Sequence, residues 1–277
     1  NKTVLVTGAA GTIGSEICRQ LIQHNVKKII AVDKSEIGIY NQQKKIFGKK
    51  ISFFLLDINE YSFLDKIIKD YKVDMIFHAA AYKHVNILEN NIFSAVKNNI
   101  FATFNICRLS VKNSCEMTFI STDKAANPIS ILGYTKKVAE KVCENFNENI
   151  NDNKKIKIVR FGNVFGSSGS AINNFLNKIN SEKTIEITSK KATRYFMTAL
   201  EACHLVLQTT TINSKGCIFI LNMGKPINIL ELAKNLGKIK MKLNNNYIFK
   251  YKETGLKPGE KLNETLKDDR EILKKIN

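Results

Sequence analysis

Short apolar runs alternate with amphipathic stretches along the first part of the chain. Six apolar runs have the length of buried strands: 2–8, 27–33, 50–57, 74–81, 116–122 and 156–164. Four stretches between them carry apolar residues at helical spacing: 13–24, 61–71, about 92–112 and about 130–146. Because strands that alternate with helices are joined by crossovers, neighbouring strands run parallel. The pattern predicts an α/β fold with a doubly wound parallel sheet of the Rossmann type.

The alternation loosens after about residue 165. The later elements are predicted as strands at 184–189 and 217–224, helices at 198–210 and 228–236, and a turn with a short helix within 254–266. We expect residues 1–165 to form the core that contains the sheet. Residues 166–277 are expected to form mostly a smaller C-terminal lobe at the carboxyl edge of the sheet, in one structural unit whose lobes interleave.

Composition narrows the class of protein. The chain has 277 residues, 44% of them hydrophobic, and no apolar run approaches the roughly 18 residues of a membrane span. It opens on a strand, without a signal peptide or a starting Met. We expect a cytoplasmic homo-oligomer, tethered to the inner membrane if the sequence is a fragment whose anchor lies upstream. Six scattered cysteines without a CxxC pair fit a reducing compartment.

Charge and histidine spacing argue against two kinds of site. The net charge is +18, but the excess is nearly all lysine spread along the chain, and no RNP, zinc-finger or helix-turn-helix pattern accompanies it. We therefore expect no nucleic-acid partner. The four histidines show no HExxH or similar spacing, so we expect no metal site.

A glycine pattern follows the first predicted strand. Gly8, Gly11 and Gly14 lie in TGAAGTIG between a strand and a helix, the setting that a dinucleotide-binding turn requires. Gly8 allows the tight turn, Gly11 lets the backbone approach a pyrophosphate, and Gly14 lets helix and strand pack closely. The N-terminus of the helix then faces the negative charge. The core is therefore predicted to bind a dinucleotide.

Acidic residues at the next strand ends indicate which dinucleotide. Asp33 ends the second strand, where a carboxylate accepts hydrogen bonds from the adenosine ribose and repels a 2′-phosphate. This favours NAD over NADP, a preference that the adjacent Lys34 would soften. Asp57 ends the third strand, where the adenine would lie, and His78 is predicted to be a core residue. The predicted cofactor residues in this part of the chain are Gly8, Gly11, Thr12, Ile13, Gly14, Asp33, Lys34, Asp57, Ile58, Ala79 and Ala80.

Several segments resemble one enzyme family: VTGAAGTIGSE, HAAAYKHV, STDKAANP, RFGNVFGSSGS, RYFM, LNMGKPINILELA and GLKPGEKLNETL. On these segments, which run from residue 6 to 266, the chain resembles an extended short-chain dehydrogenase/reductase. Within that superfamily it resembles the bacterial UDP-N-acetylglucosamine 4,6-dehydratases of polysaccharide and protein-glycosylation pathways. The resemblance implies an NAD-dependent lyase that converts a UDP-N-acetylhexosamine to its 4-keto-6-deoxy form.

The resemblance raises a question about the catalytic tyrosine. Enzymes of this superfamily usually carry Tyr four residues before a Lys, but here Leu132 stands four residues before Lys136. The larger, membrane-anchored members of the family also lack this Tyr and carry Met, and the chain resembles them more closely. Tyr134 is no substitute, because two residues along a helix turn a side chain by roughly 200°. It is predicted to pack or to lie at the surface.

The resemblance also implies the catalytic residues. Thr122, Asp123 and Lys124 follow the fifth strand, at the edge where open α/β sheets bind ligands. Thr122 would bind the hydroxyl on sugar carbon 4, Asp123 would protonate the departing hydroxyl, and Lys124 would remove the proton from carbon 5. A base role requires a depressed pKa for Lys124, which burial or the charge of Lys136 would supply. Lys136 would chiefly hold the nicotinamide ribose.

The substrate side of the resemblance lies in loops and in the lobe. Asn163 would contact the diphosphate or the sugar, Arg194 offers a planar fork for phosphate oxygens, and the GSSGS turn (166–170) suits a phosphate. Lys257 stands where family members often have Arg, which keeps the charge and loses the bidentate geometry. The predicted substrate-binding residues are Lys83, Glu89, Asn163, Arg194, Lys257 and Glu260.

Three other functions fit parts of the sequence. A dehydratase that also epimerises carbon 5 would carry the same Thr-Asp-Lys triplet. Leu132 would suit a catalytically silent NAD-binding regulator, but such a protein has no use for the triplet together with Arg194. A protein that binds anionic surfaces would rest on the net charge alone.

Overall fold

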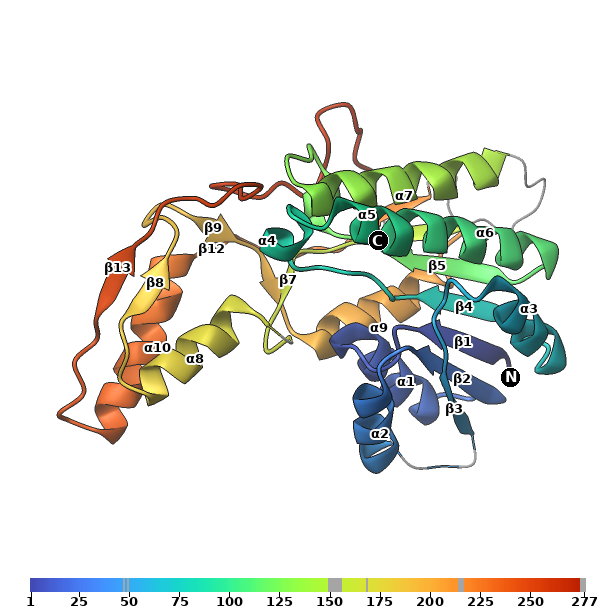
Figure 1. The fold of residues 1–277 in the computed structure, drawn as a ribbon, viewed down its shortest axis with the longest axis horizontal. Coiled ribbons are helices and arrows are strands. Elements are labelled where there is room, and N and C mark those ends of the chain that lie inside the picture. Colours follow the sequence, from blue (N-terminus) through green and yellow to red (C-terminus); the bar gives the residue numbers. More distant parts are fainter. Residues whose placement is uncertain (47, 49, 149–155, 168, 214–216, 275–277) are drawn as a thin grey trace.

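The computed structural model describes residues 1–46, 48, 50–148, 156–167, 169–213 and 217–274. Its centre is a parallel sheet of seven strands in the order β11-β6-β5-β4-β1-β2-β3 (Figure 1). The strands are β1 (Thr3–Thr7), β2 (Lys28–Asp33), β3 (Ile51–Leu55), β4 (Met75–His78), β5 (Glu116–Ile120), β6 (Lys157–Arg160) and β11 (Ile218–Ile220). The strand order runs outward from β1 in both directions. The predicted doubly wound α/β fold is confirmed.

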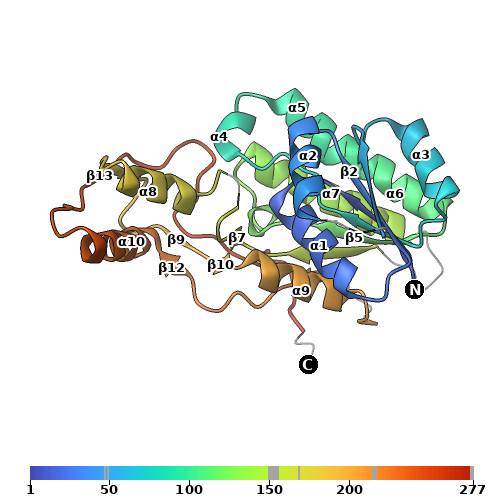
Figure 2. The ribbon, with the colours of Figure 1, turned by 90° about the horizontal axis from the view of Figure 1, so that it is seen from below.

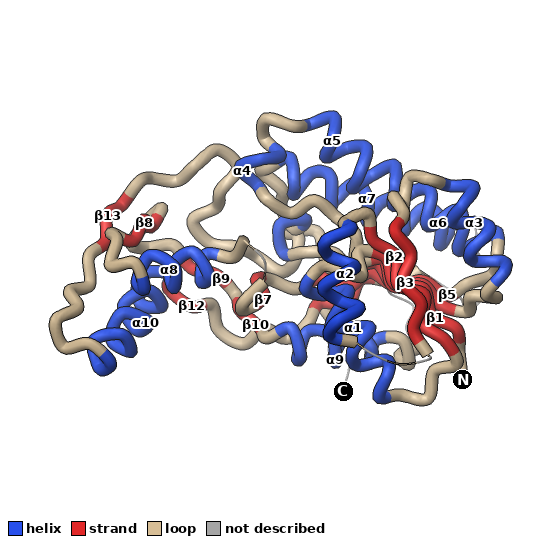
Figure 3. The backbone as a smooth tube through the Cα atoms, turned by 60° about the horizontal axis from the view of Figure 1, so that its bottom comes forward, coloured by secondary structure: helices blue, strands red, loops and turns tan. Residues whose placement is uncertain are grey.

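Helices cover both faces of the sheet, which Figure 3 shows between its two helical layers. They are α1 (Thr12–Gln23), α2 (Glu36–Lys45), α3 (Tyr61–Asp70), α4 (Val85–Leu88), α5 (Ile92–Val96), α6 (Ala102–Lys112), α7 (Ile131–Glu148) and α9 (Ala199–Thr209). A π-helical turn at Lys97–Phe101 joins α5 to α6. Val4 and Val6 of β1 pack in the core with α1 and α9, whereas Leu5 packs with α3, α6 and α7. This alternation follows from the two-residue period of a strand.

β11 is the seventh strand of the sheet, beyond the six that the sequence pattern predicts for the core. It pairs in parallel with β6 at the sheet edge, and α9, which precedes it, packs against α1. The sequence of a three-residue apolar strand does not indicate which strand it pairs with. The pairing depends on the crossover connection that brings it to the sheet. The boundary between core and lobe at residue 165 stays a prediction. α9 and β11 follow this residue in the sequence but lie with the sheet.

A smaller lobe lies to one side of the sheet (Figure 2). It contains α8 (Ala171–Asn180), α10 (Ile229–Leu243), β8 (Ile185–Ile187) and β13 (Tyr251–Glu253). Its own apolar core includes Phe175, Ile185, Leu230 and Tyr247. Short strand pairs connect this lobe to the sheet: β7 (Asn163–Val164) with β10 (Phe196–Met197), and β9 (Thr193–Arg194) with β12 (Ile227–Asn228).

The last described segment, residues 254–274, is extended, and we call it the C-terminal strap. The short helix predicted within 254–266 is wrong. These residues form a turn at Pro258–Gly259 and no helix. Gly259 has φ +77°, which breaks a helical path. The strap instead makes its polar contacts with other elements: Lys137 pairs with Asp268 over 2.7 Å, and Arg160 with Glu271 over 2.6 Å. Among the described helices, none is long and apolar enough to span a bilayer.

Candidate active site

The glycine-rich turn between β1 and α1 is closely packed. Gly8 has φ +68°, and a Cβ on it would lie 2.6 Å from the backbone nitrogen of Ala80. A Cβ on Gly14 would collide with the carbonyl group of Gly8. Gly11 precedes α1 and has no side chain that could occupy the first N–H groups of the helix. The turn therefore brings bare backbone to the N-terminus of α1, as a pyrophosphate site requires.

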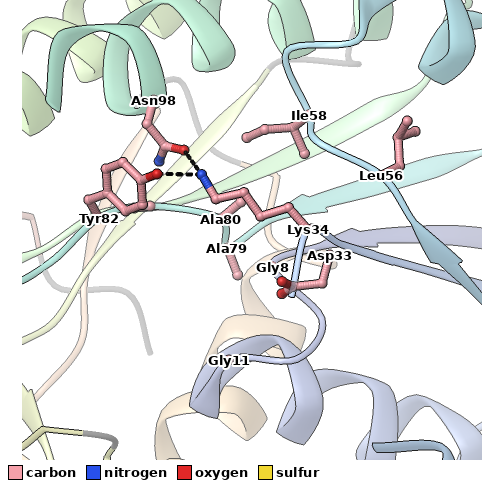
Figure 4. Close-up of a pocket in the computed structure, with 11 residues that line it drawn as sticks. Gly8, Gly11, Asp33, Lys34, Leu56, Ile58, Ala79, Ala80, Tyr82 and Asn98 are labelled. Carbon is pink, nitrogen blue, oxygen red and sulfur yellow. Dashed lines mark hydrogen bonds between the residues drawn. The ribbon is translucent and has the colours of Figure 1, made fainter. Parts of the chain in front are cut away.

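A pocket opens beside this turn (Figure 4). Seven of the predicted cofactor residues line it: Gly8, Gly11, Asp33, Lys34, Ile58, Ala79 and Ala80. Leu56, Ala81, Tyr82 and Asn98 also line it and were missed by the sequence reasoning. Tyr82 directly follows the small residues at the end of β4, a position that could have suggested it. Asn98 lies in the π-helical turn, for which the sequence carries no signal.

Asp33 is held by two backbone groups. Its Oδ2 accepts a hydrogen bond from Ala10 N over 3.0 Å, and its Oδ1 accepts one from Ser35 N over 2.9 Å. A carboxylate has about four acceptor positions, so each oxygen keeps capacity for a further donor. The fixed negative charge at the pocket wall suits the two hydroxyls of an adenosine ribose and opposes a 2′-phosphate. The residues present fit NAD.

Lys34 extends across the pocket and away from Asp33, as Figure 4 shows. Its ammonium group donates to the Tyr82 hydroxyl over 2.5 Å and to Asn98 Oδ1 over 3.1 Å. It also lies 4.0 Å from Asp57 Oδ2. Burial raises the pKa of Asp57, but hydrogen bonds from Asn59 and the charge of Lys34 outweigh it, so the pKa lies below its usual value. Lys34 is thus engaged with protein groups.

A second cluster forms where β5 ends. Asp123 lies in a short 3₁₀ turn (Asp123–Ala125) and is completely buried. Its Oδ1 accepts hydrogen bonds from the Thr122 hydroxyl over 2.8 Å and from Lys124 Nζ over 3.0 Å. Lys124 Nζ also donates to Asn163 Oδ1 over 3.4 Å. The structure therefore brings the predicted triplet and Asn163 together.

The other oxygen of Asp123 is unused. Oδ2 is buried and has no hydrogen-bond partner in the described part of the chain. A Cβ on Gly162 would lie 3.1 Å from it, so a larger residue at this position would crowd the oxygen. Buried acceptors are normally satisfied. The unpartnered oxygen of Asp123 is an exception, and it lies in the same cluster as the Thr122 hydroxyl and the Lys124 amine.

Glu264 of the C-terminal strap belongs to this cluster and was missed by the sequence reasoning. Its Oε1 lies 3.6 Å from Lys124 Nζ, and its side chain is only 4% exposed. Burial by itself lowers the pKa of Lys124, but the charges of Asp123 and Glu264 outweigh it, so the pKa lies above its usual value. The depressed pKa expected for Lys124 is therefore wrong for this state of the chain. The expectation considered burial and omitted two carboxylates, the adjacent Asp123, whose effect is larger, and Glu264, which is remote in sequence.

Lys136 lies on α7 and is buried under β5. Its Nζ donates to Ile120 O over 2.6 Å and lies 3.9 Å from the centre of the Phe119 ring. Burial lowers the pKa of Lys136 to about 8. His78 stacks on Phe119 at 5.6 Å and bonds to Thr7, and burial lowers its pKa to about 3. His78 is therefore a neutral core residue, as predicted.

Leu132, at the position of the usual tyrosine, and the nearby Tyr134 lie in different environments. Leu132 is 4% exposed and packs with Leu88 and Ala95 in a small apolar cluster. Tyr134 is 53% exposed. Of the two positions predicted for Tyr134, packed or at the surface, the structure shows the surface one, and Leu132 fills its site as an apolar core residue.

Arg194 is held by the C-terminal strap. Its Nη1 donates to Leu262 O over 2.9 Å and to Thr193 O, and its Nη2 donates to Lys261 O over 2.8 Å. Within the described residues, Nε and one Nη2 hydrogen remain, and these two form the side-on fork that suits phosphate oxygens. Arg194 therefore keeps the donors that the prediction requires.

The positions of the other predicted substrate residues give less support for a contact with substrate. Glu89 accepts a hydrogen bond from Ile131 N over 2.8 Å and so caps the start of α7. Glu260 accepts from Lys257 N over 3.1 Å within the turn of the strap. The side chains of Lys83 and Lys257 are exposed and make no hydrogen bond or ion pair with another described residue. Ser168 of the GSSGS turn lies outside the described residues.

Comparison with known proteins gives consistent matches along the chain. A family model described as "Polysaccharide biosynthesis protein" matches residues 4–277. CapD of Staphylococcus aureus, a capsular polysaccharide biosynthesis protein, is 41% identical over 280 residues, covering 98% of this chain and 46% of CapD. EpsC of Bacillus subtilis, a probable polysaccharide biosynthesis protein, is 39% identical, with the same 98% and 46% coverage. The chain spans about half the length of these relatives.

Two solved structures share the fold. Pen from Bacillus thuringiensis has a TM-score of 0.89 and 32% identity, covering 96% of this chain and 82% of that chain. DesIV from Streptomyces venezuelae, a dTDP-glucose 4,6-dehydratase solved with NAD and TYD bound, has a TM-score of 0.85 and 19% identity, covering 95% and 88%. At that lower identity the likeness to DesIV shows the fold alone.

Proposed function

Because the chain belongs to the polysaccharide biosynthesis protein family, we propose that it catalyses the NAD-dependent 4,6-dehydration of a UDP-N-acetylhexosamine, with UDP-N-acetylglucosamine as the first candidate. The product is the 4-keto-6-deoxy sugar for glycan biosynthesis. The observation that carries the proposal is the Thr122-Asp123-Lys124 cluster, which joins a hydroxyl, an acid and an amine at the end of β5. β5 belongs to the same sheet as β1, and the turn that follows β1 fits a dinucleotide.

When bound, NAD would supply a reversible hydride acceptor for sugar carbon 4 and a hydride donor for carbon 6. The chain would hold it with the Gly8–Gly14 turn, with Asp33 at the ribose, and with the small residues Ala79 and Ala80. Lys136 is the candidate for the nicotinamide ribose. Its bond to Ile120 O, at the end of β5 and two residues before Thr122, supports this assignment.

The triplet divides the proton transfers. A ketone at carbon 4 acidifies the proton on carbon 5, and loss of the hydroxyl at carbon 6 requires an acid. Asp123 would donate from Oδ2, the oxygen that no described group occupies. Lys124 would remove the carbon 5 proton as the neutral amine. Thr122, which donates to Asp123 in this state, would turn to the carbon 4 hydroxyl and pass its proton to the Asp123 carboxylate as the hydride leaves, which leaves Asp123 protonated as the acid for the hydroxyl at carbon 6.

Leu132 supports a mechanism without the usual tyrosine. An apolar side chain cannot transfer a proton, and Leu132 packs with Leu88 and Ala95. Every proton transfer must then come from the cluster beyond β5. This is consistent with a site that gathers three titratable groups, Asp123, Lys124 and Glu264, around one point.

The substrate diphosphate would approach Arg194, whose side-on fork is open. Asn163, already bonded to Lys124, lies where it can contact the sugar or the adjoining phosphate. Lys83 and Lys257 offer exposed ammonium groups for phosphate or uridine oxygens, and Glu89 and Glu260 are candidate acceptors for sugar or ribose hydroxyls.

The test is to incubate the protein with UDP-N-acetylglucosamine in D₂O and to follow the sugar by NMR. We expect a 4-keto-6-deoxy product with deuterium at carbon 5, retained configuration at that carbon, and no net consumption of NAD. Inverted configuration would identify the epimerising dehydratase. A 4-epimer that keeps its carbon 6 hydroxyl would identify an epimerase. Unchanged sugar with NAD bound would support the silent regulator.

A further inference from the structure

Contacts with both lobes hold the C-terminal strap where it passes the cluster formed by Thr122, Asp123 and Lys124. Arg194 donates to the carbonyl groups of Lys261 and Leu262, and Lys261 Nζ donates to Ala126 O over 2.7 Å. Further along, Asp268 pairs with Lys137 of α7 over 2.7 Å. Glu264 lies between these attachments. Its place beside Lys124 is therefore built into the fold by contacts on either side of it.

The Glu264 carboxylate is buried without full compensation. Oε1 lies 3.6 Å from Lys124 Nζ, and Oε2 has no hydrogen-bond partner among the described residues, although Lys261 Nζ lies 3.8 Å away. Burial of a carboxylate carries a desolvation cost that exceeds what an incomplete set of partners returns. A residue that only fastened the strap would be better served by an apolar side chain.

We propose that Glu264 is a positioning residue for Lys124: its carboxylate holds the ammonium group beside Asp123 and determines the pH at which Lys124 loses the proton and becomes a base for sugar carbon 5. The proposal rests on the proposed function. It gives the strap a chemical role, since the strap adds the charge of Glu264 to that of Asp123 in favouring the ammonium form of Lys124.

The charges that face Lys124 determine the sign of the effect. Asp123 and Glu264 favour the ammonium form, whereas Arg194 on β9 opposes it. Lys261, on the same strap, faces Glu264. Replacing Glu264 by a neutral group removes one of two favourable charges and leaves Arg194 in place. The pKa of Lys124 must then fall.

The first experiment compares pH profiles of carbon 5 deuterium exchange for the parent and Glu264→Gln. An opposite charge within about 4–6 Å shifts a pKa by about one unit or more. We expect the acidic limb of the profile to move about one pH unit lower in Glu264→Gln, and Glu264→Asp to return it toward the parent position. Glu271→Gln is the matched control, because it loosens the strap at Arg160 and leaves the charge at Lys124 unchanged.

Superimposed limbs for the parent and Glu264→Gln would overturn the proposal. So would an equal shift in Glu271→Gln, which would show that only attachment of the strap matters. Glu264→Asp keeps the test available if Glu264→Gln does not fold.

A second readout does not require the enzyme to be active. In protein labelled with ¹⁵N at lysine, the Lys124 signal, identified by its loss in Lys124→Arg, should titrate about one pH unit lower in Glu264→Gln. If the parent makes no product but this midpoint moves, the proposed function fails and the pairing of Glu264 with Lys124 stands. If product forms and the midpoint does not move, the role of Glu264 is refuted and the proposed function stands.

Discussion

Lys124 Nζ lies 3.0 Å from Oδ1 of Asp123, while the second oxygen of this buried carboxylate has no hydrogen-bond partner in the part of the chain that the structure describes. One oxygen of Asp123 thus organises the cluster. The acid and the amine are neighbours in sequence and in space. Because their proposed tasks concern different atoms of the sugar, separate substitutions can distinguish them.

Asp123→Asn keeps the shape of the side chain and removes its acidity. A well-placed general acid contributes about 10²–10⁴-fold to a rate, so we expect dehydration to fall by at least about 10²-fold. The measurement is product formation by NMR, with bound NAD quantified in the same sample. Near-parental turnover would place the acid elsewhere.

Lys124→Ala removes the proposed base. Dehydration should fall by at least about 10²-fold, and deuterium exchange at carbon 5 should disappear. Because the pKa of Lys124 is raised, the neutral amine becomes more abundant as pH rises, and parental exchange should increase with pH into the alkaline range. Lys137→Ala, which removes a lysine that pairs with the strap, is the control and should keep carbon 5 exchange.

Leu132→Ala should leave substantial dehydration, because the leucine takes no part in proton transfer. It should lower the free energy of unfolding by about 2–5 kcal/mol, the usual cost of truncating a buried leucine. Denaturant unfolding and an activity assay on folded protein separate the two effects. Leu132→Met should be nearly neutral in both. Collapse of activity in folded, NAD-containing Leu132→Ala would mean that this side chain shapes the substrate pocket.

NAD should be released when the protein is heated, and Asp33→Asn should weaken the preference for NAD over NADP. The carboxylate charge opposes a 2′-phosphate, and a hydrogen bond to a charged group is worth about 1.5–3 kcal/mol, so the ratio of affinities should fall at least about tenfold. Asp57→Asn, at the adenine end of the site, should change this ratio less. Recovery of NADP alone from the parent would contradict the role given to Asp33.

Because the Lys136 amine is buried, we expect the free energy of unfolding to depend on pH. The pKa of Lys136 falls from 10.5 to about 8 on folding, because burial disfavours the charged form. Between about pH 8 and 10.5 the unfolded chain therefore binds more protons, and stability contributed by this site rises with pH through that window. Below pH 8 the charged lysine costs the folded state about 3 kcal/mol.

Lys136→Met removes this cost. Relative to the parent, the variant should gain stability at pH 7, and its advantage should shrink as pH rises from about 8 to 10.5. Urea unfolding at several pH values measures the difference. A constant difference across the window would show that Lys136 does not titrate in the folded chain.

Local sequence patterns predicted six strands of the sheet and the dinucleotide turn, and the family resemblance supplied the candidate catalytic triplet. Gly8 and Gly14 can be recognised because their constraint lies within one strand–turn–helix unit. Asp33 follows its strand directly, and the triplet Thr122–Lys124 follows β5 in the same way. In each case, the backbone period that produces the element also determines where the polar side chain emerges.

Only the tertiary structure decided the rest. Glu264 contacts Lys124 because the strap returns from the lobe to the core, and its charge adds to that of Asp123 in raising the Lys124 pKa against the effect of burial. β11 joins β6 only after α9 has crossed over. Such relationships depend on side chains far apart in the sequence, and charge interactions act through space over a few ångströms. The sequence by itself therefore determined which groups follow β5, and the folded chain determined that the pKa of Lys124 is raised.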